Sequence, residues 1–365
     1  MVSSLSRAIR LLVVDDSAYN RRNIADIFAG STEVEVVGKA ADGEEALRLV
    51  TMLKPDVVTL DLEMPRMDGF TFLRILMARQ PTPVIVVSSY AQKENVFKAL
   101  ELGALDFVTK ADRQIAPDAV ELKEQILAKV LLVRQLKRAA LVRTSAAGRQ
   151  VSGAFTPDGK PTVLDAPLPP KFVRPRALVA LASSTGGPTA LLDIFSKVPV
   201  TCGAAFVVAQ HMPDKFTRTF AERIDRKSQV RTAEAQDGDK LGALRGFVCP
   251  GRQCMEVVAI NGELRLKVGP PASTDRYVPS GDRLLKSAAA AAAAIGIKCI
   301  GIVLTGMGDD GVEGARAIFN GGGVVIAESQ ETAIVFGMPG SVVRANVATR
   351  VLTLPQIADY VAQLT

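Results

Sequence analysis

Short apolar runs alternate with longer amphipathic segments over residues 1–110. The strand-like runs are Ile9–Val14, Val34–Gly38, Val57–Leu60, Val84–Val87 and Phe107–Thr109. Residues 18–29, 43–53, 69–79 and 91–101, which lie between them, repeat their apolar positions with a helical period. A strand followed by a helix, repeated along the chain, predicts a doubly wound, five-stranded parallel sheet of the flavodoxin-like type, with helices on both faces.

The middle of the chain loses this alternation. The charged amphipathic stretch Leu122–Leu141 predicts a long helix after the fifth strand. Residues 144–175 are rich in Ser, Gly, Thr and Pro and show little periodicity, which is typical of a flexible linker. We therefore predict a first domain over residues 1–143, a linker over 144–175 and a second domain over 176–365.

A second alternating region begins at Arg176. Its strand-like runs are Ala177–Leu181, Ala205–Ala209, Lys298–Leu304 and Val324–Ala327, and its helical segments are 188–196, 214–227, 281–294, 311–320 and 355–364. Shorter apolar runs occupy Gly246–Cys249, Met255–Ala259 and Glu263–Val268, and Asn261-Gly262 between the last two is a strong hairpin signal. The pattern predicts a second α/β domain with a doubly wound, mainly parallel sheet and an inserted β-hairpin.

Composition narrows the functional classes. The net charge is +6, but residues 111–175 alone carry 11 basic and 6 acidic side chains, so the excess lies largely in the middle segment of the chain. No DNA-reading module accompanies it, which argues against nucleic acid as a partner. No apolar run approaches the ~18 residues of a membrane span, and no signal peptide is apparent. The four cysteines lack metal-ligand spacing, as in a cytoplasmic protein with reduced thiols.

Polar side chains follow four strands of the first domain. Asp15 and Asp16 follow the first strand, Asp61 the third, Ser88 the fourth and Lys110 the fifth. In a parallel sheet these positions share the carboxyl edge, where ligands bind. Three carboxylates there repel one another unless a cation neutralises them, and Mg²⁺ suits such oxygen ligands. The Ser88 hydroxyl and the Lys110 ammonium would then hold the oxygens of a phosphoryl group.

Residues 9–110 resemble the response-regulator receiver family. The resemblance rests on Val13-Val14-Asp15-Asp16-Ser17, Leu60-Asp61-Leu62-Glu63-Met64-Pro65-Arg66-Met67-Asp68-Gly69, Val87-Ser88-Ser89 and Gly103-Ala104-Leu105-Asp106-Phe107-Val108-Thr109-Lys110. It implies that Asp61 accepts a phosphoryl group from a histidine kinase. It also implies that Asp15, Asp16, Asp61 and the backbone carbonyl of Glu63 hold Mg²⁺. Ser88 and Phe107 would form the switch that senses the phosphoryl group, with Lys110 supporting the site.

Three chemically suitable side chains follow strands of the second domain. Ser184 lies in Ser184-Thr185-Gly186-Gly187, and His211, the only histidine in the chain, lies in Gln210-His211-Met212-Pro213. The turn after Leu304 offers Asp309 and Asp310, between which composition does not choose. A hydroxyl, an imidazole and a carboxylate are the parts of a hydrolytic triad.

The second domain closely resembles the catalytic domain of the chemotaxis protein-glutamate methylesterase family over about residues 176–353. The matching residues are Ser184-Thr185-Gly186-Gly187-Pro188, Gln210-His211-Met212-Pro213, Gly251-Arg252-Gln253, Leu304-Thr305-Gly306-Met307-Gly308, Asp310-Gly311 and Gly337-Met338-Pro339. The family pattern usually has Gly where this chain has Ala182. The resemblance selects Asp310, because the family's aspartate directly precedes glycine.

The resemblance implies a phosphorylation-regulated serine esterase with no cofactor in its catalytic domain. Ser184, His211 and Asp310 would hydrolyse γ-glutamyl methyl esters on the cytoplasmic helices of methylated chemoreceptors, with Thr185 and Met307 supporting the oxyanion. Deamidation of receptor glutamines by the same route stays open. The alternative is a receiver-controlled binding protein whose triad is vestigial, and measured esterase activity would separate the two.

Overall fold

The chain divides into two compact units, residues 1–151 and 152–365. A computed structural model describes residues 7–88, 93–110, 118–136 and 173–364. Most of the predicted linker, residues 144–172, lies outside the described residues, so the predicted domain boundaries stay predictions.

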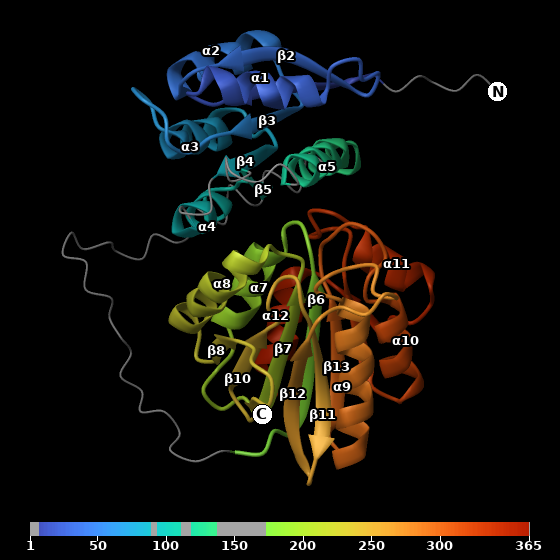
Figure 1. Cartoon of the computed structure of the whole chain (residues 1–365). Helices are drawn as coiled ribbons and strands as arrows, with labels where there is room; N and C mark the ends of the chain where they lie inside the picture. Colours follow the sequence, from blue (N-terminus) through green and yellow to red (C-terminus); the bar gives the residue numbers. More distant parts are fainter. Residues whose placement is uncertain (1–6, 89–92, 111–117, 137–172, 365) are drawn as a thin grey trace, which may run out of the picture. The chain divides into compact units, whose positions relative to one another are not determined.

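The first unit contains the predicted five-stranded parallel sheet (Figure 1). Its strands are β1 (Ile9–Val14), β2 (Val34–Ala40), β3 (Val57–Leu60), β4 (Val84–Ser88) and β5 (Asp106–Thr109), and its helices are α1 (Ala18–Ile27), α2 (Gly43–Leu53), α3 (Gly69–Arg79), α4 (Lys93–Glu101) and α5 (Asp118–Leu131). The spatial order β2-β1-β3-β4-β5 confirms the doubly wound prediction.

Alternate residues of β1 face opposite layers of helices. Leu11 and Val13 pack with Ile24 of α1 and Ile126 of α5 in one apolar cluster. On the other face, Leu12 and Leu53 of α2 meet beside Gly38, where an added Cβ would lie 3.2 and 2.7 Å from them. Helices therefore cover both faces of the sheet, as a fully buried parallel sheet requires.

The helix predicted over residues 122–141 is shorter than the pattern indicated. α5 ends at Leu131, and a 3-10 turn, η2 (Leu132–Gln135), follows it. Leu136 is already extended, with ψ of 133°. The charged amphipathic pattern contains no helix breaker, so its periodicity alone could not locate this end; residues 137–141 lie outside the described residues.

The second unit contains a seven-stranded parallel sheet in the order β15-β14-β13-β6-β7-β10-β8. Its strands are β6 (Ala177–Ser183), β7 (Ala204–Gln210), β8 (Arg231–Glu234), β10 (Arg245–Val248), β13 (Lys298–Val303), β14 (Val324–Glu328) and β15 (Arg350–Leu352). Its helices are α7 (Gly187–Ser196), α8 (Asp214–Lys227), α9 (Gly281–Ile295), α10 (Val312–Asn320), α11 (Met338–Arg344) and α12 (Leu354–Ala362). The mainly parallel α/β prediction is confirmed.

The predicted hairpin belongs to a separate three-stranded antiparallel sheet. β11 (Cys254–Ile260) pairs with β12 (Glu263–Gly269), which in turn pairs with β9 (Lys240–Leu241). Asn261 and Gly262 both have positive φ, 52° and 77°, as a type I′ turn requires. The remaining predicted short run, Gly246–Cys249, forms β10 within the main sheet.

The main sheet of this unit is covered on both faces. Ala205 and Val207 of β7 share an apolar cluster with Leu284 and Leu285 of α9. Between them in sequence, Phe206 points to the other face and packs on Phe195 of α7 with ring centroids 5.2 Å apart. The four cysteines are free and buried. Within the described part of the chain, no helix is long and apolar enough to cross a membrane.

Candidate active site and acidic pocket

The register of two central strands brings the predicted serine and histidine to neighbouring positions. Ser183, the last residue of β6, pairs with Gln210, the last residue of β7. The His211 N–H donates to the Ser183 carbonyl at 3.0 Å. Ser184 and His211 therefore leave adjacent strand ends at the same edge of the sheet.

Ser184 lies in a tight turn between β6 and α7. Its N–H donates to the Thr305 carbonyl at 3.0 Å, and its carbonyl accepts the Gly187 N–H at 2.8 Å. Gly186 has φ of 80°, a conformation that glycine adopts without strain, and it caps α7. The hydroxyl consequently lies beside the N-terminus of a helix, where exposed N–H groups favour developing negative charge.

Gln210 ties the serine turn to the histidine strand. This buried amide donates through Nε2 to the carbonyls of Ser184 (2.9 Å) and His211 (3.0 Å). Its Oε1 accepts the Ser183 hydroxyl at 2.7 Å. A Cβ on Gly187 would lie 2.1 Å from that Oε1, so this glycine makes room for Gln210 as well as for the turn. No local sequence pattern marks this role of Gln210, because it depends on contacts that form only in the folded chain.

Asp310 is hydrogen-bonded to the His211 imidazole. His211 Nε2 lies 2.8 Å from Asp310 Oδ2, and the carboxyl is 1% exposed. The first N–H groups of α9, those of Gly281 and Asp282, donate to the same carboxylate at 2.7 and 2.9 Å. Burial raises the pKa of Asp310, but the hydrogen bond and charge of His211 and these N–H groups outweigh it, so the pKa lies below its usual value. Asp310 is therefore held as a carboxylate.

This pairing fixes the histidine tautomer. Because Asp310 is a hydrogen-bond acceptor, Nε2 carries the proton and Nδ1 is left as the basic nitrogen. Within the described residues, no hydrogen bond joins the Ser184 hydroxyl to His211.

Asp309, the neighbouring candidate, has a different contact. It accepts the Tyr277 hydroxyl at 2.9 Å and pairs with Arg276 at 3.3 Å. The Tyr277 ring stacks on the His211 ring, with centroids 5.3 Å apart and planes 8° from parallel. Asp309 thus holds the tyrosine that covers one face of the imidazole. The structure brings Asp310, and not Asp309, to His211.

The loop after β13 carries Met307, which the sequence predicts as an oxyanion donor. Gly306 forms an isolated parallel bridge with Phe336, and its carbonyl accepts N–H groups from Gly337 and Met338. A Cβ at Gly306 would lie 2.7 Å from Ser184 Cβ, so this loop passes directly beside the serine. The Met307 N–H has no hydrogen-bond partner among the described residues. It remains available as a donor.

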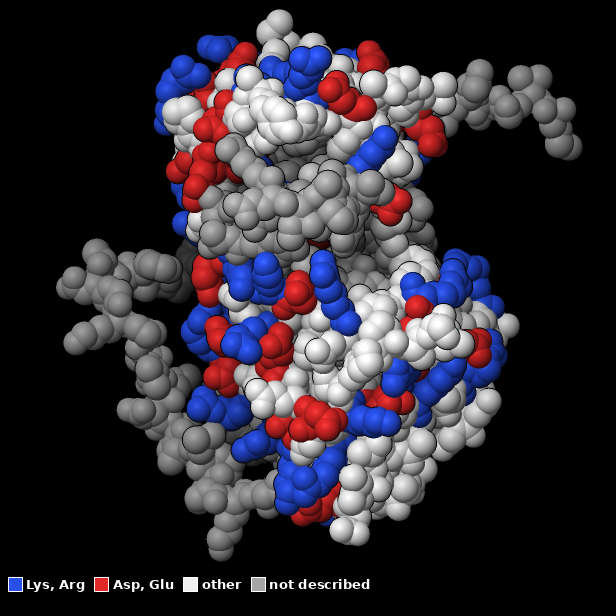
Figure 2. Space-filling view, in the orientation of Figure 1, with Lys and Arg blue, Asp and Glu red and all other residues white. Residues whose placement is uncertain are grey.

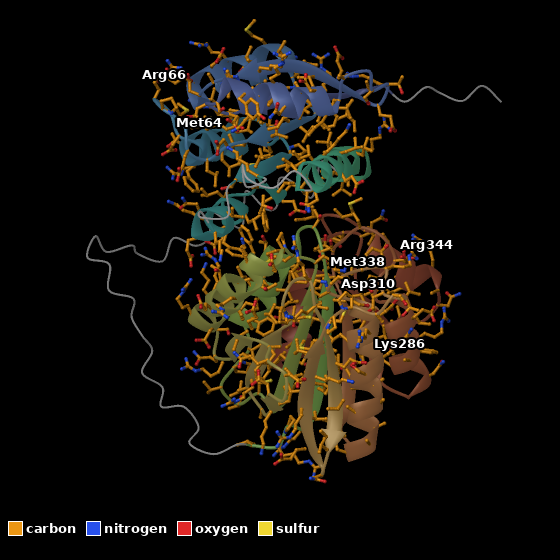
Figure 3. The ribbon with its side chains drawn as sticks, viewed as in Figure 1. Met64, Arg66, Lys286, Asp310, Met338 and Arg344 are labelled. Atoms are coloured by element: carbon orange, nitrogen blue, oxygen red, sulfur yellow. The ribbon has the colours of Figure 1, made fainter. Side chains whose placement is uncertain are left out.

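An open pocket of about 970 Å³ adjoins Asp310. Lys286 and Arg344, labelled with Asp310 in Figure 3, line it together with Tyr277 and Asp309. Charges of both signs are interspersed over the face of this unit drawn in Figure 2.

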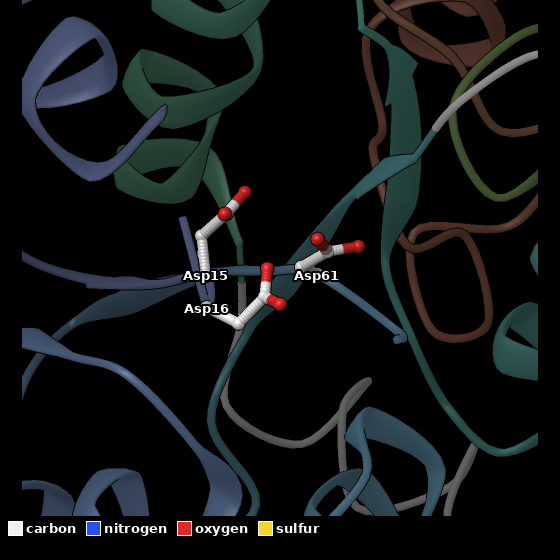
Figure 4. A group of neighbouring side chains, drawn as sticks. All are labelled: Asp15, Asp16 and Asp61. Atoms are coloured by element: carbon white, nitrogen blue, oxygen red, sulfur yellow. The ribbon is translucent and has the colours of Figure 1, made fainter. Parts of the chain in front are cut away.

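In the first unit, the three predicted aspartates gather at the carboxyl edge of the sheet (Figure 4). One oxygen from each of Asp15, Asp16 and Asp61 lies within 4.8 Å of the others. Lys110 Nζ lies 3.0 Å from Asp15 Oδ2 and also contacts Asp61. Burial raises the pKa of Asp61, and the nearby negative charge of Asp15 acts in the same direction. A set of three crowded carboxylates is a donor set that fits a hard divalent cation.

The remaining predicted residues surround this cluster. Ser88 is fully buried at the end of β4, and its carbonyl accepts the Lys110 N–H at 2.8 Å. The Phe107 ring is buried and packs edge-on against Phe97 of α4 at 6.5 Å. Glu63 lies in the exposed loop after Asp61. A Cβ at Gly69 would approach the Asp61 carbonyl to 2.4 Å, so glycine allows α3 to begin against this strand end.

Together these units define a two-domain response regulator: a receiver domain with an acidic edge, and an α/β output domain of hydrolase type. Family models match it as the response regulator receiver domain over residues 11–119 and as CheB methylesterase over residues 179–361.

Relatives match along nearly the whole chain. Protein-glutamate methylesterase/protein-glutamine glutaminase 3 of Geobacter sulfurreducens is 44% identical, covering 98% of this chain and 97% of its own. Protein-glutamate methylesterase/protein-glutamine glutaminase 1 of Myxococcus xanthus is 42% identical, covering 98% of this chain and 97% of its own. The protein-glutamate methylesterase/protein-glutamine glutaminase of Pyrococcus abyssi is 38% identical, covering 98% of this chain and 94% of its own. The chain belongs to the CheB methylesterase family, whose members are hydrolases.

Ala182, where the family pattern usually has glycine, packs tightly against Gly281. A Cβ at Gly281 would lie 2.8 Å from Ala182 Cβ and 3.0 Å from Asp310 Oδ2. We predict that Gly281→Ala lowers the free energy of unfolding by about 1–3 kcal/mol, because it overpacks a buried contact. Gly269→Ala is the control, since a Cβ there has nothing within 4 Å. Urea unfolding would measure both, and equal stabilities would contradict this packing.

Proposed function

We propose that this chain is a serine esterase that hydrolyses γ-glutamyl methyl esters on the cytoplasmic helices of chemoreceptors. The observation that carries the proposal is the buried His211–Asp310 pair, at 2.8 Å, on the strand end next to the Ser184 turn. The names of the relatives support the same substrate class. The proposed site of action is the cytoplasm, where these receptor helices lie.

The proposed reaction proceeds through an acyl-enzyme. The Ser184 hydroxyl attacks the ester carbonyl while His211 Nδ1 takes its proton, and Asp310 stabilises the resulting imidazolium. The N–H of Met307, with Thr185, donates to the oxyanion; one such donor is worth about 3–4 kcal/mol of barrier. The imidazolium then protonates the leaving methanol. Water, deprotonated by the same imidazole, hydrolyses the acyl-enzyme and restores the serine.

The same route would also release ammonia from a glutamine side chain. The acyl-enzyme is identical, and only the leaving group that His211 protonates differs. The relatives' second name, protein-glutamine glutaminase, favours including this activity in the proposal.

In the receiver domain, we propose that Asp61 accepts a phosphoryl group from a histidine kinase. Asp15, Asp16, Asp61 and the Glu63 carbonyl would hold Mg²⁺, which when bound neutralises the carboxylates and the incoming phosphoryl oxygens. Lys110, already at Asp61 and Asp15, would pair with the phosphoryl group. The Ser88 hydroxyl would bond it, and Ser88 with Phe107 would transmit its presence to the esterase.

Replacement of the nucleophile tests the esterase proposal. Ser184→Ala is expected to lower methanol release from methylated receptor by several orders of magnitude, because the covalent route is lost. Circular dichroism would check that the fold is retained. A variant that keeps more than about a tenth of wild-type turnover would overturn the assignment of Ser184 as the nucleophile.

The two adjacent aspartates form a matched pair for a second prediction. Asp310→Asn is expected to reduce kcat on the order of 10⁴-fold, since the amide no longer fixes the tautomer or stabilises imidazolium. Asp309→Asn is expected to cost far less, because it acts on His211 only through Tyr277. Steady-state kinetics would compare them. Equal losses would contradict the assignment of Asp310.

Regulation is tested at Asp61. A small-molecule phosphodonor is expected to label the wild type and raise its esterase rate, and to do neither in Asp61→Asn. Chelation of Mg²⁺ should abolish labelling, because the crowded carboxylates then repel the phosphoryl oxygens. Asp26→Asn, an exposed carboxylate on α1, is the control. Labelling of Asp61→Asn at the wild-type level would overturn the phosphoacceptor assignment.

A further inference from the structure

A buried carboxyl that the proposed reaction does not use lies next to the serine turn. Glu328, the last residue of β14, is 1% exposed. Its Oε2 accepts the backbone N–H of Thr305 at 2.8 Å. Without this carboxyl, the buried Thr305 N–H would lack a hydrogen-bond acceptor.

Thr305 connects this carboxyl to the nucleophile. Its carbonyl accepts the Ser184 N–H at 3.0 Å. Its hydroxyl donates to the Thr185 carbonyl and accepts the Val335 N–H, both at 2.9 Å. Every polar group of Thr305 is thus engaged, and each bond fixes a segment of the site. Met307 follows two residues later on the same loop.

We propose that Glu328 is a positioning residue of the esterase site, which fixes Thr305 and through it both the Ser184 turn and the loop that carries Met307. This inference rests on the proposed esterase function. Glu328 touches neither substrate nor reacting atoms. Its contribution is to the placement of the nucleophile and of the oxyanion donor.

The ionisation of Glu328 gives this role a measurable signature. Burial raises the pKa of Glu328 from 4.5 to about 7, and the charge of Asp193 on α7 acts in the same direction. The Thr305 N–H and the Thr332 hydroxyl lower the pKa, but by less than burial raises it. Because the pKa is higher in the folded than in the unfolded chain, stability falls as the pH rises from about 4.5 to about 7. Glu328 therefore titrates in the same pH range as an ordinary histidine, and the chain has only one histidine, His211.

Two substitutions separate hydrogen bonding from charge. Glu328→Gln keeps an acceptor for Thr305 and is expected to retain kcat within a few-fold. Glu328→Ala leaves the N–H unsatisfied and is expected to lower kcat on the order of tenfold or more, with KM nearly unchanged. Glu331→Gln, an exposed carboxyl three residues later, is the control. A folded Glu328→Ala enzyme with wild-type kcat would overturn the proposal.

A second measurement does not need activity. In full-length His211→Ala protein, which contains no histidine, the Thr305 amide resonance is expected to titrate with a midpoint near pH 7, set by Glu328. Adding Glu328→Gln should abolish that titration. A Thr305 amide that does not respond to pH, or responds equally in both proteins, would overturn the proposal even if Glu328→Ala fails to fold. A wild type that releases no methanol while Thr305 still titrates would instead refute the esterase function.

Discussion

The parallel pairing of β6 with a strand on each side determines the geometry of the catalytic unit. β7 places His211 beside Ser183, and β13 leads to the Thr305 carbonyl that accepts the Ser184 N–H. All three strands end at the same edge, so the proposed nucleophile, base and oxyanion loop meet without a long connecting segment. A slip of one residue in either pairing would turn these side chains to the other face of the sheet. The buried apolar core therefore enforces the site's geometry as well as the stability of the unit.

Both units place carboxyl groups in buried surroundings, and they stabilise the charge in different ways. Asp310 receives two helix N–H groups and an imidazole, so its pKa is lowered. Burial and the negative charge of Asp15 raise the pKa of Asp61, although the Lys110 ammonium acts in the opposite direction. Glu328 has few donors, and burial raises its pKa to about 7. The number of fixed donors, more than depth of burial, separates a permanent carboxylate from a titrating one.

The sequence predicted most of the fold because the central strands are continuous apolar runs and most of the helices are periodic. It missed β8, β9 and β15, which are short and carry exposed residues such as Arg231, Lys240 and Arg350. α11 was missed too, since it begins within a Gly-Met-Pro segment. These elements lack the length or the apolar alternation that makes local sequence informative.

Site residues, like the helices and strands, could be predicted only where a local sequence pattern marks them. The positions of Ser184, His211 and the three receiver aspartates followed from strand ends, and the choice of Asp310 required the family resemblance. Gln210, Tyr277 and Glu328 could not be identified, because each acts through contacts between residues distant in the sequence. Their side-chain types occur commonly in turns and strand ends, so no local pattern marks them.

The solitary histidine has a practical consequence. Any imidazole signal from the intact chain, whether from proton NMR or from a histidine-selective reagent, originates at His211. Because the Tyr277 ring stacks almost parallel on it, ring current should displace that signal from the position of a free imidazole. The protein therefore contains a natural spectroscopic reporter of its proposed active site, which can be observed in a 38.7 kDa chain without any engineered label.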